Sequence, residues 1–389
     1  MAIREVKLGK VATVKGGKRL PKGINLITKP NPHPYIRVRD LNGKKTLELD
    51  GSFEFVDDET QKAISRYIVT GGDIVLSIVG TIGLVSVVGD SLNEANLTEN
   101  CVKLTSLSGI DRDYLYYYLK SSYGQQEIAR GTVGAVQAKL PIKNIQDISI
   151  PLPDEVTQRK IADILSSLDA KIEVNQRIND NLADLLQTVY QERFGDTSLI
   201  ANQGILSDIC SYSRDKVAVS ELNVSTYFST ENMLSGKAGS TEATSLPTTS
   251  QTTACHKGDT LISNIRPYFK KIVYCEDNCG CSTDVLCFTP SQPRYSAYLF
   301  STLYADKFFA FMVAGSKGTK MPRGDKQQIM TYPVVLPSEE ELAGFNTIAS
   351  PLLEQIYSNS AENKRLSILR DTLLPKLMSG EIDVSAIQL

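Results

Sequence analysis

Residues 154–194 read DEVTQRKIADILSSLDAKIEVNQRINDNLADLLQTVYQERF and contain neither glycine nor proline. This segment follows Pro151-Leu152-Pro153, which cannot continue a helix, and it stops at Gly195. About 40 uninterrupted residues predict a helix roughly 60 Å long, far longer than an ordinary globular helix. Apolar residues recur in it at intervals of four and three, as in the seam of a coiled coil. The seam residues are Ile161, Leu165, Leu168, Ile172, Leu182, Leu186 and Val189, with Asn175 and Asn179 between them.

A second copy of this seam lies near the C-terminus. The Leu-Pro pair at 152–153 recurs at 336–337, an offset of 184 residues (337 − 153 = 184). Applied to the seam, the offset gives Phe345, Ala349, Leu352, Ile356, Asn359, Asn363, Leu366, Arg370 and Leu373. The chain is therefore predicted to be an internal duplication that contains two long helices.

Both seam asparagines recur at this offset. A buried asparagine in a seam lowers stability but fixes the register and orientation of the pair. If the helices pair antiparallel, we expect Asn175 to face the region of Asn363 and Asn179 to face that of Asn359. Alternatively, these amides lie on the solvated faces of two unrelated helices.

Composition sets broad limits on function. The chain has 389 residues, of which 41% are hydrophobic, and this length suggests two or three domains. A net charge of −2 gives no global indication of nucleic-acid binding, but residues 1–50 hold 12 Lys and Arg against 4 Asp and Glu. We find neither a signal peptide nor an apolar run long enough to span a bilayer, so we expect a cytoplasmic protein without a membrane partner.

The cysteine pattern favours buried thiols over a metal site. The seven cysteines of a cytoplasmic chain are expected to be free. Cys275, Cys279, Cys281 and Cys287 are a zinc candidate, but they lack paired C-x-x-C spacing, so we predict no metal and no catalytic residue. A zinc enzyme that uses Cys255 and His256 is the less favoured alternative, and with only two histidines general acid–base chemistry has few candidates.

The duplication divides the chain into four segments. We predict globular domains at 1–153 and 197–337, each followed by a long helix, at 154–196 and 338–389. The expected fold class is α/β (α+β), with two similar domains separated by two long antiparallel helices and an internal pseudo-twofold.

The two domains share a strand frame but differ in its loops. Gly71–Ser77 and Lys257–Ser263 each predict a turn that leads into a buried strand. The loop that follows is Gly80-Thr81-Ile82-Gly83 in the first domain and Arg266–Lys271 in the second. A rigid frame that carries a variable loop is the usual basis of binding sites with different specificities.

A tyrosine-rich helix and a polar glycine loop complete each domain. Asp113–Ile128 is predicted to be a helix, matched by Ser296–Met312, and we favour core packing over base stacking for its four tyrosines. The loops Gly131–Lys139 and Gly315–Arg323 follow at the same offset. They lack the spacing of a phosphate-binding P-loop, but their hydroxyls, amide and bases suit DNA phosphates and base edges.

A basic segment opens the first domain. We predict a strand at Tyr35–Arg39, on which Arg37 and Arg39 share one face because side chains alternate. Such a face suits phosphates or guanine, although a merely solvated basic face is an open alternative. The candidate DNA contacts are Lys18, Arg19, Arg37, Arg39, Thr81, Thr132, Gln137 and Lys139 in the first domain, and Arg266, Tyr268, Lys270, Lys317, Thr319, Lys320 and Arg323 in the second.

The second long helix carries its own start and stop signals. Ser338 with Glu341 predicts a capping box, and Gly380 is expected to end the helix. Pro351 is expected to kink or restart it, with Ser350 as a possible cap.

Several of these motifs together resemble one known family. They are the Leu165–Glu173 run (LSSLDAKIE), the Ile-Pro-Leu-Pro before it, the Gly-Asp-Ile-Val-Leu-Ser strand, and the ending Leu373–Ile382 (LLPKLMSGEI). In order and duplication they are similar to the specificity subunit of type I restriction-modification systems, over essentially the whole chain.

The resemblance implies two target-recognition domains, each reading one half of a split double-stranded DNA sequence, with the helices setting the gap. It also implies that the subunit has no chemistry and no cofactor of its own. Two modification subunits would bind S-adenosylmethionine, methylate adenine N6 and dock on the long helices, and restriction subunits could join them. The alternative function is a non-catalytic coiled-coil adaptor that presents two protein-binding domains.

Overall fold

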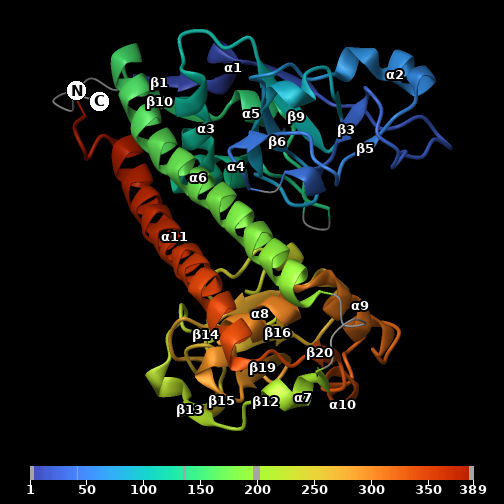
Figure 1. Cartoon of the computed structure of the whole chain (residues 1–389). Helices are drawn as coiled ribbons and strands as arrows, with labels where there is room; N and C mark the ends of the chain where they lie inside the picture. The colour runs from blue at the N-terminus through green and yellow to red at the C-terminus, as the bar shows by residue number, and fades with distance from the viewer. Residues whose placement is uncertain (1–3, 42, 135–136, 196–201, 385–389) are drawn as a thin grey trace. The chain divides into compact units, whose positions relative to one another are not determined.

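The computed structural model describes residues 4–41, 43–134, 137–195 and 202–384. Its contacts form two units, here called unit 1 (Met1–Glu173 with Asn363–Leu389) and unit 2 (Val174–Glu362). Each unit holds one β-rich domain and one half of each long helix (Figure 1). The mixed helix and sheet class with two domains and a long central helix is thus confirmed, while the boundary predicted at 196/197 lies outside the described residues.

The first long helix, α6, is a single helix of 40 residues (Glu155–Phe194). It starts where Asp154 accepts a hydrogen bond from the backbone N–H of Thr157 (3.0 Å), as an N-cap does. It ends immediately before Gly195, as the sequence predicted. Within the described part of the chain, neither this helix nor any other is long and apolar enough to cross a membrane.

The second long helix, α11, has 41 residues (Glu339–Ser379). The predicted capping box is confirmed, because Ser338 N–H donates to the Glu341 carboxylate (2.8 Å) and Glu341 N–H donates to Ser338 Oγ (3.3 Å). The restart predicted at Pro351 is wrong, because α11 runs through this residue. Pro351 is exposed, so the helix carbonyl that it leaves without a donor can be hydrated. Gly380 follows the helix in a left-handed conformation (φ 75°) and ends it.

Halves of the two long helices pair antiparallel within each unit (Figure 1). In unit 1, Arg370 Nη1 donates to Asp169 Oδ1 (2.6 Å) and Asn363 Nδ2 donates to Ile172 O (3.3 Å). As the residue number rises on α6 it falls on α11, which is the antiparallel order that the sequence suggested.

In unit 2 the helix pair contains amide contacts. Asn359 Nδ2 donates to Asn179 Oδ1 (2.8 Å), so the predicted pairing of these two asparagines is present. Asn175 Nδ2 donates to Glu362 Oε2 (2.7 Å). Asn175 and Asn359 are buried, so the amides do not lie on solvated faces.

The domain of unit 1 is built on a five-stranded sheet with the order β2-β9-β6-β7-β4. Its strands are β2 (Thr13–Gly16), β4 (Thr46–Leu47), β6 (Ile74–Ser77), β7 (Val85–Val88) and β9 (Cys101–Thr105). A three-stranded sheet, β5-β3-β8, uses β3 (Pro34–Ile36), β5 (Glu54–Phe55) and β8 (Asn96–Leu97), and β1 (Arg4–Lys7) pairs with β10 (Ser149–Leu152). The helices are α1 (Leu8–Val11), α2 (Asp58–Ile64), α3 (Arg112–Lys120), α4 (Ser122–Gly131) and α5 (Ile142–Gln146).

The domain of unit 2 has two four-stranded sheets where unit 1 has a five-stranded and a three-stranded sheet. One four-stranded sheet, β12-β19-β16-β17, uses β12 (Cys210–Tyr212), β16 (Thr260–Ser263), β17 (Ile272–Tyr274) and β19 (Val285–Pro290). A second, β13-β15-β18-β14, uses β13 (Lys216–Ala218), β14 (Tyr227–Phe228), β15 (Gln251–Cys255) and β18 (Cys279–Cys281), and β11 (Gln203–Ile205) pairs with β20 (Pro333–Val335). The helices are α7 (Leu206–Ile209), α8 (Ser296–Tyr304), α9 (Asp306–Ala314) and α10 (Lys326–Ile329).

The single helices predicted at Asp113–Ile128 and Ser296–Met312 are wrong, because each is two helices. The break falls at Ser121 in unit 1 and at Ala305 in unit 2, 184 residues apart (305 − 121 = 184), and both residues have extended backbone angles. The Ser121 hydroxyl accepts the N–H of Gly124 (3.2 Å) and so caps α4.

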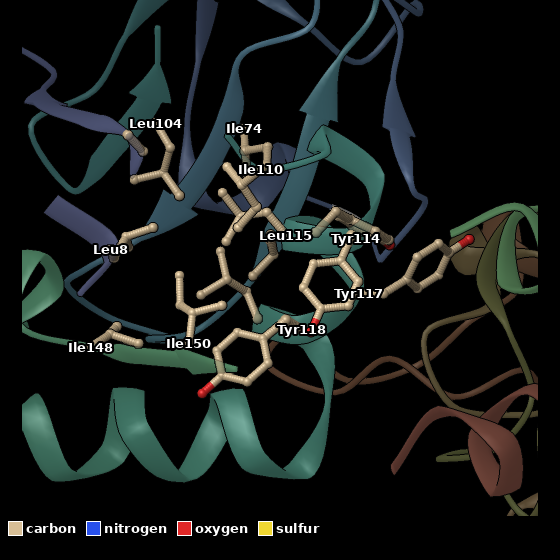
Figure 2. Close-up of a cluster of buried hydrophobic side chains, with 14 of the residues drawn as sticks. Leu8, Ile74, Leu104, Ile110, Tyr114, Leu115, Tyr117, Tyr118, Ile148 and Ile150 are labelled. Carbon is tan, nitrogen blue, oxygen red and sulfur yellow. The ribbon is translucent and has the colours of Figure 1, made fainter. Parts of the chain in front are cut away.

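The tyrosines of α3 belong to the core, as predicted. Figure 2 shows Tyr114 and Tyr118 beside aliphatic side chains that include Ile150 of β10, while the ring of Tyr117 points away from these side chains. Their hydroxyls have specific acceptors: Tyr114 donates to Pro151 O (2.6 Å) and Tyr117 to Asp169 Oδ2 (2.7 Å) on α6. Burial raises the pKa of Tyr118 to about 12, so these phenols stay neutral donors.

Candidate nucleic-acid interface

Each unit carries a short hairpin between the paired short helices and the next helix. In unit 1 the backbone groups of Val133 and Lys139 exchange two hydrogen bonds of 2.9 Å. In unit 2, Lys317 and Arg323 exchange the same two bonds, also at 2.9 Å. The paired residues of the two hairpins are each 184 residues apart in the sequence (317 − 133 and 323 − 139). The duplicated glycine loops therefore adopt the same hairpin in both units. Residues 135–136 of the first loop lie outside the described residues.

Both hairpins depend on a glycine with a left-handed backbone. Gly134 has φ 97° and Gly318 has φ 100°. A Cβ on Gly134 would lie 2.6 Å from the carbonyl oxygen of Gln137, closer than real Cβ contacts come. The turn in unit 1 therefore requires glycine on both conformational and steric grounds.

The hairpins are joined to the loops that leave the central strands β6 and β16. The bridges are Val79 to Lys139 in unit 1 and Ile265 to Arg323 in unit 2. In unit 2, Arg266 N–H also donates to Pro322 O (2.8 Å). The two loops that the sequence identified separately in each domain thus lie together and form one surface per unit, here called the hairpin surface.

The hairpin surface of unit 1 presents three of the predicted contact residues to solvent. Thr81, Gln137 and Lys139 are exposed. Thr132 is half-buried, and its hydroxyl donates to Ile128 O (2.8 Å), so it helps to end α4. A hydroxyl, an amide and an ammonium group are therefore exposed on this surface.

The hairpin surface of unit 2 is more basic. Lys317, Thr319, Lys320 and Arg323 are all exposed. Lys317 Nζ lies 2.5 Å from Asp325 and, as its hydrogen-bond donor, lowers the pKa of that carboxyl. Arg323 Nη2 lies 3.1 Å from Asp284 Oδ1, with 54% of the Arg side chain exposed. These pairs orient the cations while leaving them accessible to a phosphate or base.

A second basic group lies beside it, on the loop between β16 and β17. Arg266, Tyr268 and Lys270 are close in sequence, and Lys270 Nζ lies 3.0 Å from Asp306 Oδ1. Lys237 Nζ lies 2.8 Å from the same oxygen. The hydrogen bonds from both lysines lower the pKa of Asp306. Sequence reasoning missed Lys237 and Asp306, whose only signals are a Gly-Lys-Ala-Gly loop and a helix start.

The strand predicted at Tyr35–Arg39 is wrong, because β3 ends at Ile36 and Val38–Asp40 is a 3-10 helix. The Asp40 carboxylate accepts the N–H of Arg37 (2.7 Å) and turns the chain. Arg37 and Arg39 both bond to Glu54, Arg39 at 2.9 Å. Only 18% of the Arg37 side chain is exposed, so its guanidinium stabilises the domain and is not free for DNA.

Lys18 and Arg19 follow β2 and are both exposed. Arg19 Nε donates to Glu99 Oε1 (2.6 Å), and this hydrogen bond raises the pKa of the guanidinium. Lys18 Nζ lies 5.6 Å from the centre of the Tyr67 ring. Among the described residues of the first domain, Lys18 and Arg19 therefore contact Tyr67 and Glu99 and not the hairpin.

Most of the cysteines gather in one core of unit 2. Cys255, Cys275, Cys279, Cys281 and Cys287 belong to the same buried cluster, and the sulfurs of Cys275 and Cys279 are 3.7 Å apart. All seven cysteines are free and buried. Among the described residues, no group of three or more His, Cys, Asp or Glu side chains is arranged to hold a metal ion.

Comparison with known proteins agrees with this architecture. Residues 3–183 match the family model of the type I restriction modification DNA specificity domain. The type I restriction enzyme MjaIX specificity subunit of Methanocaldococcus jannaschii is 22% identical over 384 residues, which cover 90% of this chain and 87% of that protein. The HindI specificity subunit of Haemophilus influenzae is 33% identical over 81 residues, or 21% of this chain and 18% of that protein.

A solved structure shows the same fold. The S subunit of a type I restriction-modification system from M. genitalium aligns with a TM-score of 0.56 and 19% identity, over 97% of this chain and 96% of that one. This likeness shows that the chain shares the fold of that subunit. Residues 3–183 therefore match the DNA specificity domain of type I restriction-modification systems, and the chain as a whole is similar to the specificity subunits of such systems.

Proposed function

We propose that this chain reads a bipartite, asymmetric DNA target, with one half-site for each hairpin surface. One observation carries the proposal: the same hairpin is joined to the same strand exit in both units, but its side chains differ. Lys139 in unit 1 corresponds to Arg323 in unit 2, and Gln137 corresponds to Met321. Two equal frames with unequal reading groups suit a target whose halves differ in sequence.

The shape and chemistry of these hairpins suit the major groove of DNA. That groove admits a two-stranded ribbon, and base edges there present acceptors to lysine and arginine and complementary groups to amides. Arg323 and Lys139 lie at the paired end of each hairpin, and Lys317 and Lys320 are placed to contact phosphates. The ion pairs with Asp284 and Asp325 are exchanged for DNA contacts at low cost because the cations, Arg323 and Lys317, are exposed.

The long helices are proposed to set the gap between the half-sites and to bind the partner subunits. Both helices are continuous across the boundary between the units. They also present exposed apolar side chains suited to a protein partner, including Ile178, Leu185, Ile368 and Leu369. We infer a complex with two modification subunits, which would bind S-adenosylmethionine and methylate adenine, and with restriction subunits where these are present. The chain itself would act without catalysis, in the cytoplasm.

Genome-wide mapping of methylated adenines tests this function. The chain is co-expressed with its modification subunit, and Lys139→Ala and Arg323→Ala are compared with the original. Each substitution should relax one position of its own half-site only, because a base-reading contact gives about 1 to 3 kcal/mol of discrimination. Lys62→Ala, an exposed lysine on α2, is the matched control and should leave the map unchanged.

A second pair of variants separates base contacts from phosphate contacts. Arg266→Ala should relax one position, whereas Lys320→Ala should weaken binding to all sequences alike and reduce its salt dependence. Unchanged affinity and specificity in both variants would remove this surface from the interface. A complex without methylation and without salt-dependent DNA binding would indicate the adaptor function instead.

A further inference from the structure

Two aromatic side chains form the tip of the loop between β16 and β17. The tip is a single 3-10 turn, Pro267–Phe269. Tyr268 is 50% exposed and Phe269 is 38% exposed, and their ring centres are 4.7 Å apart. Phe269 is the only exposed phenylalanine among the described residues. Large apolar groups held in solvent on a loop usually mark a binding surface.

The tip is held rigid from both sides. Arg266 and Lys270 flank it with left-handed backbones (φ 50° each), a conformation that non-glycine residues adopt at a cost in free energy. Hydrogen bonds maintain it: Lys270 N–H donates to Pro267 O (2.9 Å), and Lys237 N–H donates to Lys270 O (2.9 Å). A pre-formed tip loses little conformational entropy when it binds, so the rings are prepared for a ligand.

The surroundings of the tip are cationic. Lys237 and Lys270 share one carboxylate, Asp306, and Arg266 adds a third positive charge. The tip is also continuous with the hairpin surface, because Arg266 N–H donates to Pro322 O. The ligand that fits is flat, apolar on its faces and bordered by negative charge, which describes a step between stacked bases in DNA.

The first domain lacks this feature. Its corresponding loop, Gly80–Gly83, has no aromatic residue, and Ile82 packs against the core. An insertion into the base stack is therefore expected in only one of the two half-sites.

We propose that Tyr268 and Phe269 form a wedge that inserts between neighbouring bases of the half-site read by unit 2, with Lys270 at a flanking phosphate. This inference rests on the proposed function and adds a way of reading DNA through its deformability. Pyrimidine–purine steps unstack most easily, so one such step is expected under the wedge.

The test uses the complex of this chain with its modification subunit, on duplexes of the mapped target that carry 2-aminopurine at successive positions. The fluorescence of this base rises when it is unstacked. The modification subunit is expected to flip the adenines that it methylates out of the stack, so those positions are left out of the comparison. At the remaining positions the wild-type complex should raise the signal several-fold at one step of the second half-site and at none of the first. Phe269→Ala should abolish the rise and weaken binding about ten-fold, because stacking on an aromatic ring supplies that order of affinity.

Two variants act as controls. Tyr268→Phe keeps both rings and should keep the signal, while Tyr123→Ala removes an aromatic ring of similar exposure (46%) on α4 and should change nothing. A wild-type complex that methylates its target without any rise in fluorescence outside the methylated adenines would overturn the wedge and leave the proposed function standing. Loss of the modification subunit on Phe269→Ala, with the fluorescence unchanged, would also overturn it and assign the tip to a protein contact. Absence of both binding and methylation would overturn both proposals.

Discussion

Replacing Asn179 with leucine should destabilise unit 2, because this residue is at the centre of a hydrogen-bond network between the helices. Its Nδ2 donates to Ile356 O and Ser360 Oγ (3.2 Å each), and its Oδ1 accepts from Asn359 Nδ2 (2.8 Å). Three bonds at a net value of about 0.5 to 1.5 kcal/mol each give a loss of roughly 1.5 to 4.5 kcal/mol. The half-buried leucine returns about 1 kcal/mol through apolar burial.

The double variant Asn179→Leu with Asn359→Leu should be much less destabilised than the sum of the single variants. Each single substitution leaves the other amide without its partner, and Asn359 is only 6% exposed. An unsatisfied buried amide costs about 1 to 3 kcal/mol, and the double substitution removes this penalty. We therefore expect a coupling free energy of roughly 1 to 3 kcal/mol.

Urea unfolding followed by far-UV circular dichroism measures these free energies, since both long helices contribute to the signal. Asn181→Leu is the matched control, because it makes the same change at an exposed position of α6 and should alter the midpoint little. Strictly additive single effects, each as small as that of Asn181→Leu, would refute a role for the amide pair in helix pairing.

Gly134→Ala should distort the hairpin of unit 1, since the new Cβ would meet the Gln137 carbonyl and the left-handed backbone costs about 1 to 3 kcal/mol; methylation mapping should then show one half-site lost and the other retained. Asp306 should titrate below the ordinary aspartate value of 3.8, because Lys237 and Lys270 donate to its carboxylate. Because the pKa of Asp306 is lowered on folding, the two ion pairs stabilise unit 2 fully at pH values above 3.8, the ordinary aspartate pKa. This stabilisation is lost as the pH falls through the lowered pKa of the folded protein. NMR titration of the carboxyl carbon should show this, and Lys237→Ala should move the pKa back upward; an unshifted value in the wild type would contradict the geometry.

The two long helices and their pairing could be predicted because they depend on sequence patterns that occur twice in the chain. The absence of glycine and proline fixed the length of α6, and the offset of 184 residues identified α11 and the Asn179–Asn359 contact. The tyrosines of α3 were assigned to the core from their spacing alone. Periodicity, breakers and duplication are properties that a single sequence displays directly.

The wrong predictions of secondary structure fall where local backbone geometry differs from what the pattern of side chains suggests. A carboxylate at Asp40 turns the chain after Ile36, so alternation did not make a strand of Arg37 and Arg39. An extended backbone at Ser121 divides the tyrosine helix, and the serine hydroxyl caps the helix that follows. Each hairpin is joined to the loop after the central strand by backbone pairing, such as the bridge between Val79 and Lys139. Backbone pairing does not depend on side-chain type, so the sequence did not predict this contact.

The way the chain threads its two units has a consequence for biosynthesis. Unit 2 is one contiguous segment, Val174–Glu362, whereas unit 1 needs Asn363 onward to complete its core, to which Leu377 and Val384 contribute. During synthesis the second domain therefore has all of its residues before the first does. The domain of unit 1, which is synthesised first, can therefore complete its core only after the last turns of α11 have been synthesised.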